Sequence, residues 1–80
     1  MNDKNNRDLG PQPIADLMKE LGLDRHDLVA ASTEQITHKM VARACKGRRL
    51  SFKVQQKILK ALNTASEKEF VLSDLFNYKA

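Results

Sequence analysis

Apolar residues recur in this chain at helical spacing, and helix-breaking residues separate the stretches. The first stretch has one apolar stripe at i, i+3, i+4 and i+7, formed by Ile14, Leu17, Met18 and Leu21. Pro13 suits a first helical turn, and Gly22 supplies a left-handed stop. The pattern predicts a first helix over residues 13–21.

A second helix is expected to begin after Asp24, because its carboxylate can accept the free N–H groups of a first turn. Asp27 adds favourable negative charge in that turn. Leu28 and Val29 then supply apolar residues, and the helix is expected to continue to Ala31.

Two registers are possible for the third helix, and both end at Gly47. In the first, Ser32 caps a long helix of about 33–46, and Gln35 completes a capping box by reaching back to it. This capping signal favours the first register.

In the second register, the second helix runs on to Glu34 and a turn follows over 35–37. Thr37 then caps a shorter helix over 38–46. On a helical wheel Ile36, Met40 and Ala44 line the apolar face of this helix, with Val41 beside them. In both registers the same five residues face outward, and only the position of Gln35 depends on the register: His38, Lys39, Ala42, Arg43 and Lys46.

A fourth helix is predicted from Ser51, as its cap, to about Leu62, with Asn63 in the left-handed position after its end. Ser73 is expected to cap a short last helix. Four apolar residues of the tail either close the core or form a homodimer surface: Phe70, Leu72, Phe76 and Tyr78.

The chain of 80 residues is long enough for one small domain. Residues 1–12 lack periodicity and are interpreted as a flexible N-terminal arm, and 13–80 as the folded domain. The fold class expected is all-α, a compact bundle of four to five helices.

The charge is distributed unevenly. Residues 35–60 hold eight of the 14 basic residues and no acid, whereas the rest of the chain holds the other six with all 10 acids. The middle third therefore carries +8 inside a remainder of −4, which together give the net charge of +4. Such a polarised surface favours a polyanionic partner, although a solvated charged face is the simpler reading.

Several function classes lack the residues that they need. One cysteine, Cys45, excludes an intrachain disulfide, and with His26 and His38 it gives no metal-ligand spacing. No nucleophile–base pair or Gly-rich phosphate loop is present, so the sequence predicts no enzyme, metal, cofactor or small-molecule ligand. The N-terminus lacks the apolar run of a signal peptide, no stretch could span a membrane, and a cytoplasmic location is expected.

The order of these elements resembles the Cro and phage-repressor type of helix-turn-helix domain, over roughly residues 14–76. The stretches that carry the resemblance are LGLDRHDL (21–28), ARACKGRR (42–49), KILKALN (57–63) and LSDLF (72–76). The usual glutamine of the first motif helix and the turn glycine are absent, and 23–47 is a few residues longer than the family pattern. The resemblance implies a lambda-repressor-like bundle that binds double-stranded DNA, with helix three in the major groove.

The outward residues suit that chemistry. Lys39 and Arg43 can donate to guanine, Gln35 can pair with adenine, and Ala42 fits a thymine methyl. The basic turn is better placed for phosphates. The candidate DNA-binding residues are Gln35, His38, Lys39, Ala42, Arg43, Lys46, Arg48, Arg49, Ser51 and Lys53.

The sequence thus predicts a small transcriptional regulator of bacterial or phage type, acting at the nucleoid. Two alternatives use the same basic face: an RNA-binding module, and an adaptor that docks an acidic protein. The low aromatic content of 5% argues against recognition of single strands by stacking.

Overall fold

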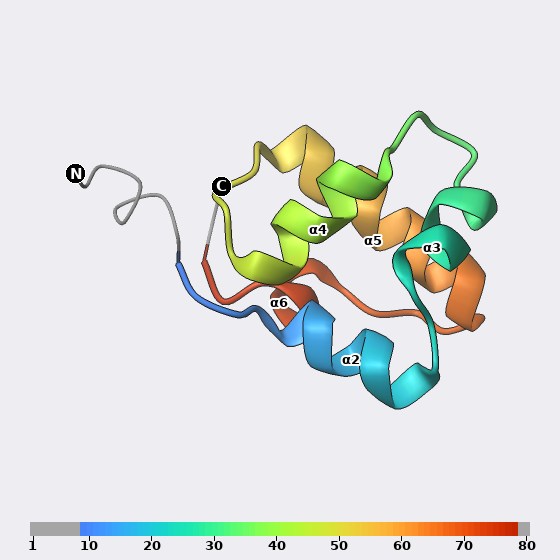
Figure 1. The fold of residues 1–80 in the computed structure, drawn as a ribbon, viewed down its shortest axis with the longest axis horizontal. Helices are drawn as coiled ribbons and strands as arrows, with labels where there is room; N and C mark the ends of the chain where they lie inside the picture. Colours follow the sequence, from blue (N-terminus) through green and yellow to red (C-terminus); the bar gives the residue numbers. More distant parts are fainter. Residues whose placement is uncertain (1–8, 79–80) are drawn as a thin grey trace.

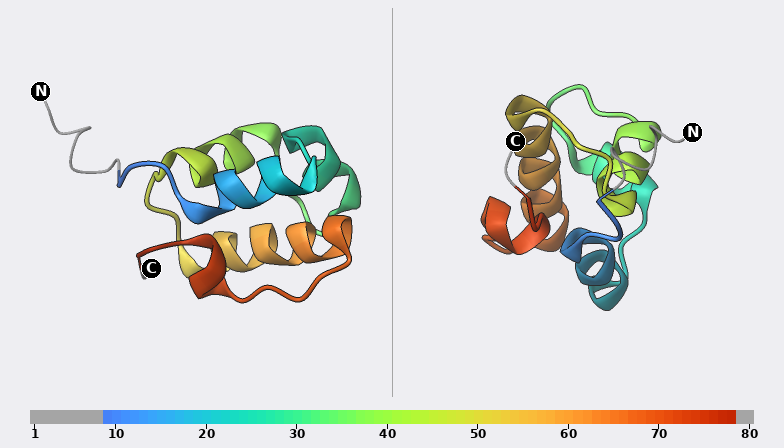
Figure 2. Two further views of the ribbon diagram at one scale, coloured as in Figure 1. Left: turned by 90° about the horizontal axis from the view of Figure 1, so that it is seen from below. Right: turned by 90° about the vertical axis from the view of Figure 1, so that its left-hand side faces the viewer.

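The computed structural model describes residues 9–78, and these form five helices without a strand, which confirms the all-α class. The helices are α2 (Pro13–Leu21), α3 (Arg25–Ala31), α4 (His38–Lys46), α5 (Phe52–Ser66) and α6 (Leu72–Leu75). As Figures 1 and 2 show, α2 and α4 lie in one layer, α5 and α6 lie in the other, and α3 packs against α5 at one end.

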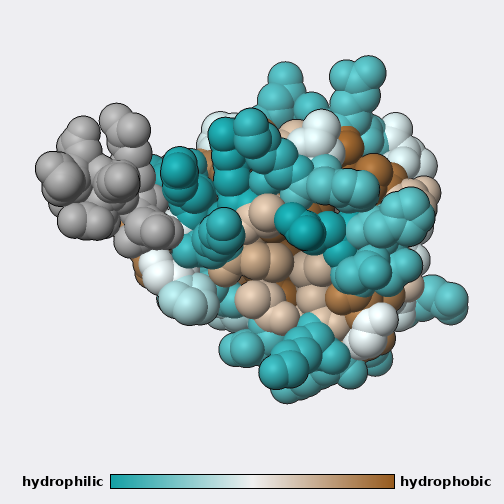
Figure 3. Space-filling model, in the orientation of Figure 1, coloured by the Kyte–Doolittle hydropathy of each residue, from teal (hydrophilic) through white to brown (hydrophobic). Residues whose placement is uncertain are grey.

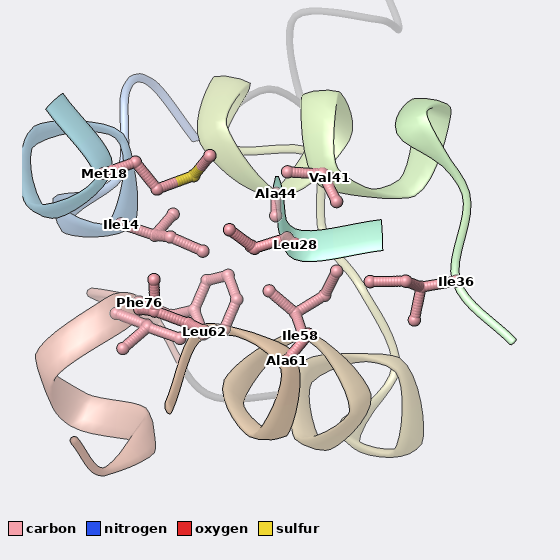
Figure 4. Close-up of a cluster of buried hydrophobic side chains, with 11 residues drawn as sticks. Ile14, Met18, Leu28, Ile36, Val41, Ala44, Ile58, Ala61, Leu62 and Phe76 are labelled. Carbon is pink, nitrogen blue, oxygen red and sulfur yellow. The ribbon is translucent and has the colours of Figure 1, made fainter. Parts of the chain in front are cut away.

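The core fills the space between the two layers (Figure 4). Its buried apolar side chains are Ile14, Met18, Leu28, Ile36, Val41, Ala44, Ile58, Ala61, Leu62, Leu75 and Phe76. Most of them belong to the predicted apolar stripes. The stripes therefore account for how each helix is turned toward its neighbours, and they leave the polar side of α4 outward.

Most predicted helix ends are confirmed. Gly22 and Gly47 take left-handed φ values of 70° and 90° after α2 and α4. Asp24 caps α3 by accepting the Asp27 backbone N–H at 2.9 Å, and Asp27 accepts the Asp24 N–H in return. Ser51 caps α5 by accepting the Val54 N–H at 3.3 Å.

The favoured start of the third helix, near Thr33, is wrong. The Ser32 hydroxyl bonds locally with Glu34, accepting its N–H at 3.0 Å and donating to its carbonyl at 2.6 Å. The Thr37 side chain instead accepts the Met40 N–H at 3.1 Å, so α4 begins at His38. The second register thus had the start of α4 right, but its extension of α3 to Glu34 is also wrong.

Two other predicted boundaries change. The helix expected to end near Leu62 continues to Ser66, and Glu67 rather than Asn63 takes the left-handed position, with φ 59°. The Asn63 side chain instead bonds with both backbone groups of Phe70, at 2.8 and 3.1 Å. The last helix begins at Leu72, not after Ser73.

Residues 9–12, predicted to be the end of a flexible arm, are packed against the end of α4. Leu9 N–H donates to the Gly47 carbonyl at 2.8 Å, and Gln12 N–H donates to the Cys45 carbonyl at 3.1 Å. The Gln12 side chain is only 1% exposed, and it also accepts the Asn77 N–H at 2.8 Å. The rest of the predicted arm, residues 1–8, lies outside the described part of the chain.

The four tail residues offered as a dimer surface differ in burial. Phe76 is buried, while Phe70, Leu72 and Tyr78 are half-buried and pack against the core. In the single chain these contacts close one side of the bundle. Phe52, the first residue of α5, is 56% exposed.

Candidate nucleic-acid interface

Helix α4 is held to the bundle by one side and is open to solvent on the other. Val41 and Ala44 are buried, and Met40 and Cys45 flank them at partial exposure. At 100° per residue, Lys39 and Lys46 project opposite this buried pair. The predicted division of α4 into a core side and a basic side is therefore what the packing shows.

The ten predicted site residues are called the basic face below. Nine of them are exposed, and Ala42 is half-buried. They come from three consecutive pieces of chain: the end of the 32–37 connection, α4, and the connector that leads into the first turn of α5. Gln35 lies in the first of these pieces, off the helix, so it does not share the register of the α4 side chains.

One edge of the basic face lies against α3. The ring centroids of His26 and His38 are 5.9 Å apart, which places the first turns of α3 and α4 side by side. Arg25 lines the same surface groove as Ala42 and Lys46. Arg25 and His26 thus adjoin the basic face. No pattern in the sequence indicated this, because only the packing of α3 beside α4 brings them there.

The other edge contains three arginines. Arg43, Arg48 and Arg49, with Leu50, line a hollow of about 390 Å³. Arg48 N–H donates to the Arg43 carbonyl at 3.0 Å, which ties the connector to the last turn of α4. Three guanidinium groups around one hollow make a site of high positive potential.

Tyr78 supports the backbone of this arginine edge. Its hydroxyl accepts the Leu50 N–H at 3.0 Å and donates to the Arg48 carbonyl at 3.1 Å. The Arg49 guanidinium carbon lies 5.4 Å from the centre of the tyrosine ring, within the range of a cation–π contact. The tail, which is remote in sequence, therefore fixes the direction of the connector.

The first turn of α5 continues the face, and the rest of α5 leaves it. Ser51 and Lys53 are exposed beside the connector, whereas Lys57 is half-buried. Further along, Lys60 forms an exposed ion pair with Glu34 at 3.6 Å. Lys57 and Lys60 therefore do not belong to the basic face.

Two side chains near the face have shifted pKa values. The Asp27 backbone N–H is the main cause that lowers the pKa of Asp24, so this carboxylate is ionised and already bonded. Burial raises the pKa of the Cys45 thiol, opposed in part by Arg25, so the thiol is protonated at neutral pH. Neither group presents an activated nucleophile or base to the basic face.

Among residues 9–78, no cluster of three or more histidines, cysteines or acids could hold a metal ion. Within the same range, none of the helices is both long and apolar enough to cross a bilayer. Searches of protein-family models, curated proteins and solved structures found no match to this chain.

Proposed function

We propose that this protein is a small transcriptional regulator that binds double-stranded DNA, with α4 in the major groove. One observation carries the proposal: an acid-free basic stretch is exposed along one continuous surface, from α4 through the arginine connector to the first turn of α5. The acidic residues of the chain lie outside this stretch, so the electrostatic field at this surface attracts a polyanion.

The dimensions of α4 suit the groove. A helix of about 10–12 Å in diameter fits a major groove about 12 Å wide. The outward row of α4 holds groups that read base edges: Lys39 and Arg43 donate to guanine, and the small Ala42 accommodates a thymine methyl. Lys46 follows in the last turn of α4 and contacts the backbone.

In this proposal, the connector and the first turn of α5 contact the DNA phosphates. Arg48, Arg49 and Lys53 are exposed on one edge of the face, where contacts add affinity and set the register without reading sequence. The capped N-terminus of α5 at Ser51 adds backbone N–H groups that favour an anion. In this arrangement α3 and α4 act as the two helices of a helix-turn-helix, which agrees with the resemblance in sequence.

A matched pair of charge reversals tests the assignment. Arg43→Glu removes a predicted base contact, whereas Lys68→Glu makes the same charge change at an exposed residue beyond α5. We expect Arg43→Glu to weaken duplex binding at least about tenfold, from the loss of one good base contact, and Lys68→Glu to have much less effect. If fluorescence-anisotropy titrations show the same loss of DNA affinity for both variants, the assignment of the basic face as the DNA-binding surface is rejected.

The ligand class needs its own experiment. In vitro selection from a random duplex pool will reveal any preferred site and whether it is palindromic, as expected for a homodimer. For the selected duplex, log K should fall by about 0.9 per phosphate contact for each tenfold rise in salt. If single-stranded RNA displaces the duplex at equal concentration, RNA is the better assignment for the ligand. If neither nucleic acid binds at low salt, the result favours the alternative in which the protein is an adaptor for an acidic protein.

A further inference from the structure

An apolar groove runs between α2 and α4, beside the basic face. It is a shallow groove, widely open to solvent, with a volume of about 470 Å³, and residues of the junction between α2 and α3 line one end. Figure 3 shows it as a hollowed tan and brown area ringed by hydrophilic side chains. Apolar hollows with polar rims are typical of interaction sites.

Small and sulfur-containing residues form the floor of the groove. Ala15 from α2 and Ala42 from α4 both line it, and their short side chains leave the space between the helices unfilled. Below them, the Cys45 and Met18 sulfur atoms lie 3.7 Å apart. Methionine adapts its shape to different apolar partners, so this floor suits an inserted aliphatic or aromatic side chain.

Positive charge dominates the rim. Lys19, Arg25 and Lys46 line the groove with a single acid, Asp24. The Asp24 carboxylate already accepts the Asp27 N–H, and neither of the α2 acids, Asp16 and Glu20, contributes to the lining. A ligand with carboxylates around an apolar side chain therefore matches both the rim and the floor.

We infer that this groove binds an acidic amphipathic segment of a partner protein, which inserts a leucine or phenylalanine side chain between α2 and α4. Its carboxylates pair with Lys19, Arg25 and Lys46. The apolar floor separates this ligand from DNA, because a phosphate gains nothing from contact with Ala15, Met18 or Cys45. Helix-in-groove recognition of this kind needs only a short segment.

The segment and DNA exclude one another, because Ala42 and Lys46 belong to both the groove and the basic face. This exclusion rests on the proposed function, whereas binding of the segment does not. A partner that carries such a segment would release the protein from DNA.

Synthetic helical peptides of about 15 residues test the groove directly, with leucines at i, i+3, i+4 and i+7 and glutamates elsewhere. Two control peptides replace either the glutamates by lysines or the leucines by serines. The acidic apolar peptide should bind at least ten times more tightly than either control, measured by anisotropy without DNA. Amide shifts should centre on Ala15, Met18 and Cys45. Shifts centred on Lys39 and Arg43 instead, or equal binding of all three peptides, would overturn the inference.

Two variants in which an alanine is replaced by glutamate locate the peptide-binding site. Ala15→Glu places a bulky carboxylate in the groove, whereas Ala30→Glu makes the same change at an exposed α3 residue outside it. We expect at least tenfold weaker peptide binding for the first and less than a twofold change for the second. If the two variants differ in their unfolding midpoints, Ala15→Glu has a folding defect, and a second measurement on the unaltered protein replaces it. Cys45 is the only cysteine, so its alkylation by N-ethylmaleimide can be followed directly. The bound peptide must slow this reaction if it occupies the groove.

The outcomes separate the two proposals. Loss of peptide binding in Ala15→Glu, with Arg43→Glu still defective in DNA binding, supports both. No peptide binding and no protection of Cys45, with normal DNA binding, rejects the groove and leaves the DNA proposal standing. Peptide binding without any DNA binding rejects the proposed function and retains the groove.

Discussion

The two ends of α4 are held in different ways. At its C-terminal end, three separate pieces of chain meet, including the first and last described segments (Figure 1). At its N-terminal end, the chain arrives through an exposed connection over 32–37 that has one buried side chain, Ile36. Both ends belong to the basic face. The contrast therefore indicates which residues of the basic face are already held in position before a ligand binds.

Long-range contacts hold the C-terminal end. Gly47 is buried and accepts the Leu9 N–H, and a Cβ there would overlap the Gly10 carbonyl oxygen. On the other side of the connector, the Tyr78 hydroxyl bonds with Arg48 and Leu50. The arginine edge is thus presented in one direction by residues far away in sequence.

The contacts at the N-terminal end are mostly local or exposed. Thr37 caps the helix, Ser32 bonds with Glu34 two residues on, and Glu34 pairs with Lys60 at the surface. An exposed ion pair of this kind contributes little to stability. We infer that phosphate contacts at the connector are preorganised, whereas Gln35 can adjust its position when the ligand binds.

The largest effect is expected from Gly47→Ala. The substitution needs a left-handed alanine, at about 1 kcal/mol, and displaces residues 9–12, with loss of two backbone hydrogen bonds worth about 1 kcal/mol each. Unfolding free energy should therefore fall by about 3 kcal/mol in urea titrations. Gly22→Ala is the matched control, because its φ of 70° is also left-handed but its Cβ would meet nothing within 4 Å. It should cost only about 1 kcal/mol, and equal losses would refute the role of close packing at Gly47.

Tyr78→Phe should have an intermediate effect. The phenyl ring keeps the contact with Arg49, whereas the hydroxyl bonds to Arg48 and Leu50 are lost. Two such bonds are worth about 1–2 kcal/mol together. Hydrogen exchange of the Leu50 amide should accelerate by more than that of Met40, which reports on the opposite end of α4. Equal acceleration at both amides would mean that the two ends are not held independently.

The sequence was sufficient for several elements in which a residue acts on its own neighbours. The apolar stripe from Ile14 to Leu21, the Asp24 cap and the Gly22 and Gly47 stops all depend on helical spacing or on the local backbone. The outward direction of Lys39 and Arg43 followed from the same periodicity, so the α4 part of the basic face was predictable.

The rest depends on tertiary contacts that periodicity does not encode. Gln12 looked like part of a polar arm, but its side chain is buried and accepts the backbone N–H of Asn77, near the other end of the chain. Asn63 had the chemistry of a left-handed cap and instead binds Phe70 across a turn. Arg25 and His26 reach the basic face only because α3 packs beside α4. Each case needed a partner whose position no local pattern reveals.

The start of α4 was ambiguous because two residues could cap it, and this ambiguity defines the smallest of the expected effects. Thr37→Ala should cost about 1 kcal/mol, because the Met40 N–H loses its side-chain acceptor. Ser32→Ala should cost less, since its hydroxyl bonds only with the exposed backbone of Glu34. Urea titrations measure both, and exchange of the Met40 amide should accelerate only in Thr37→Ala. The reverse order would mean that the helix begins near Thr33 in solution, and that Ser32 rather than Thr37 caps its N-terminal end.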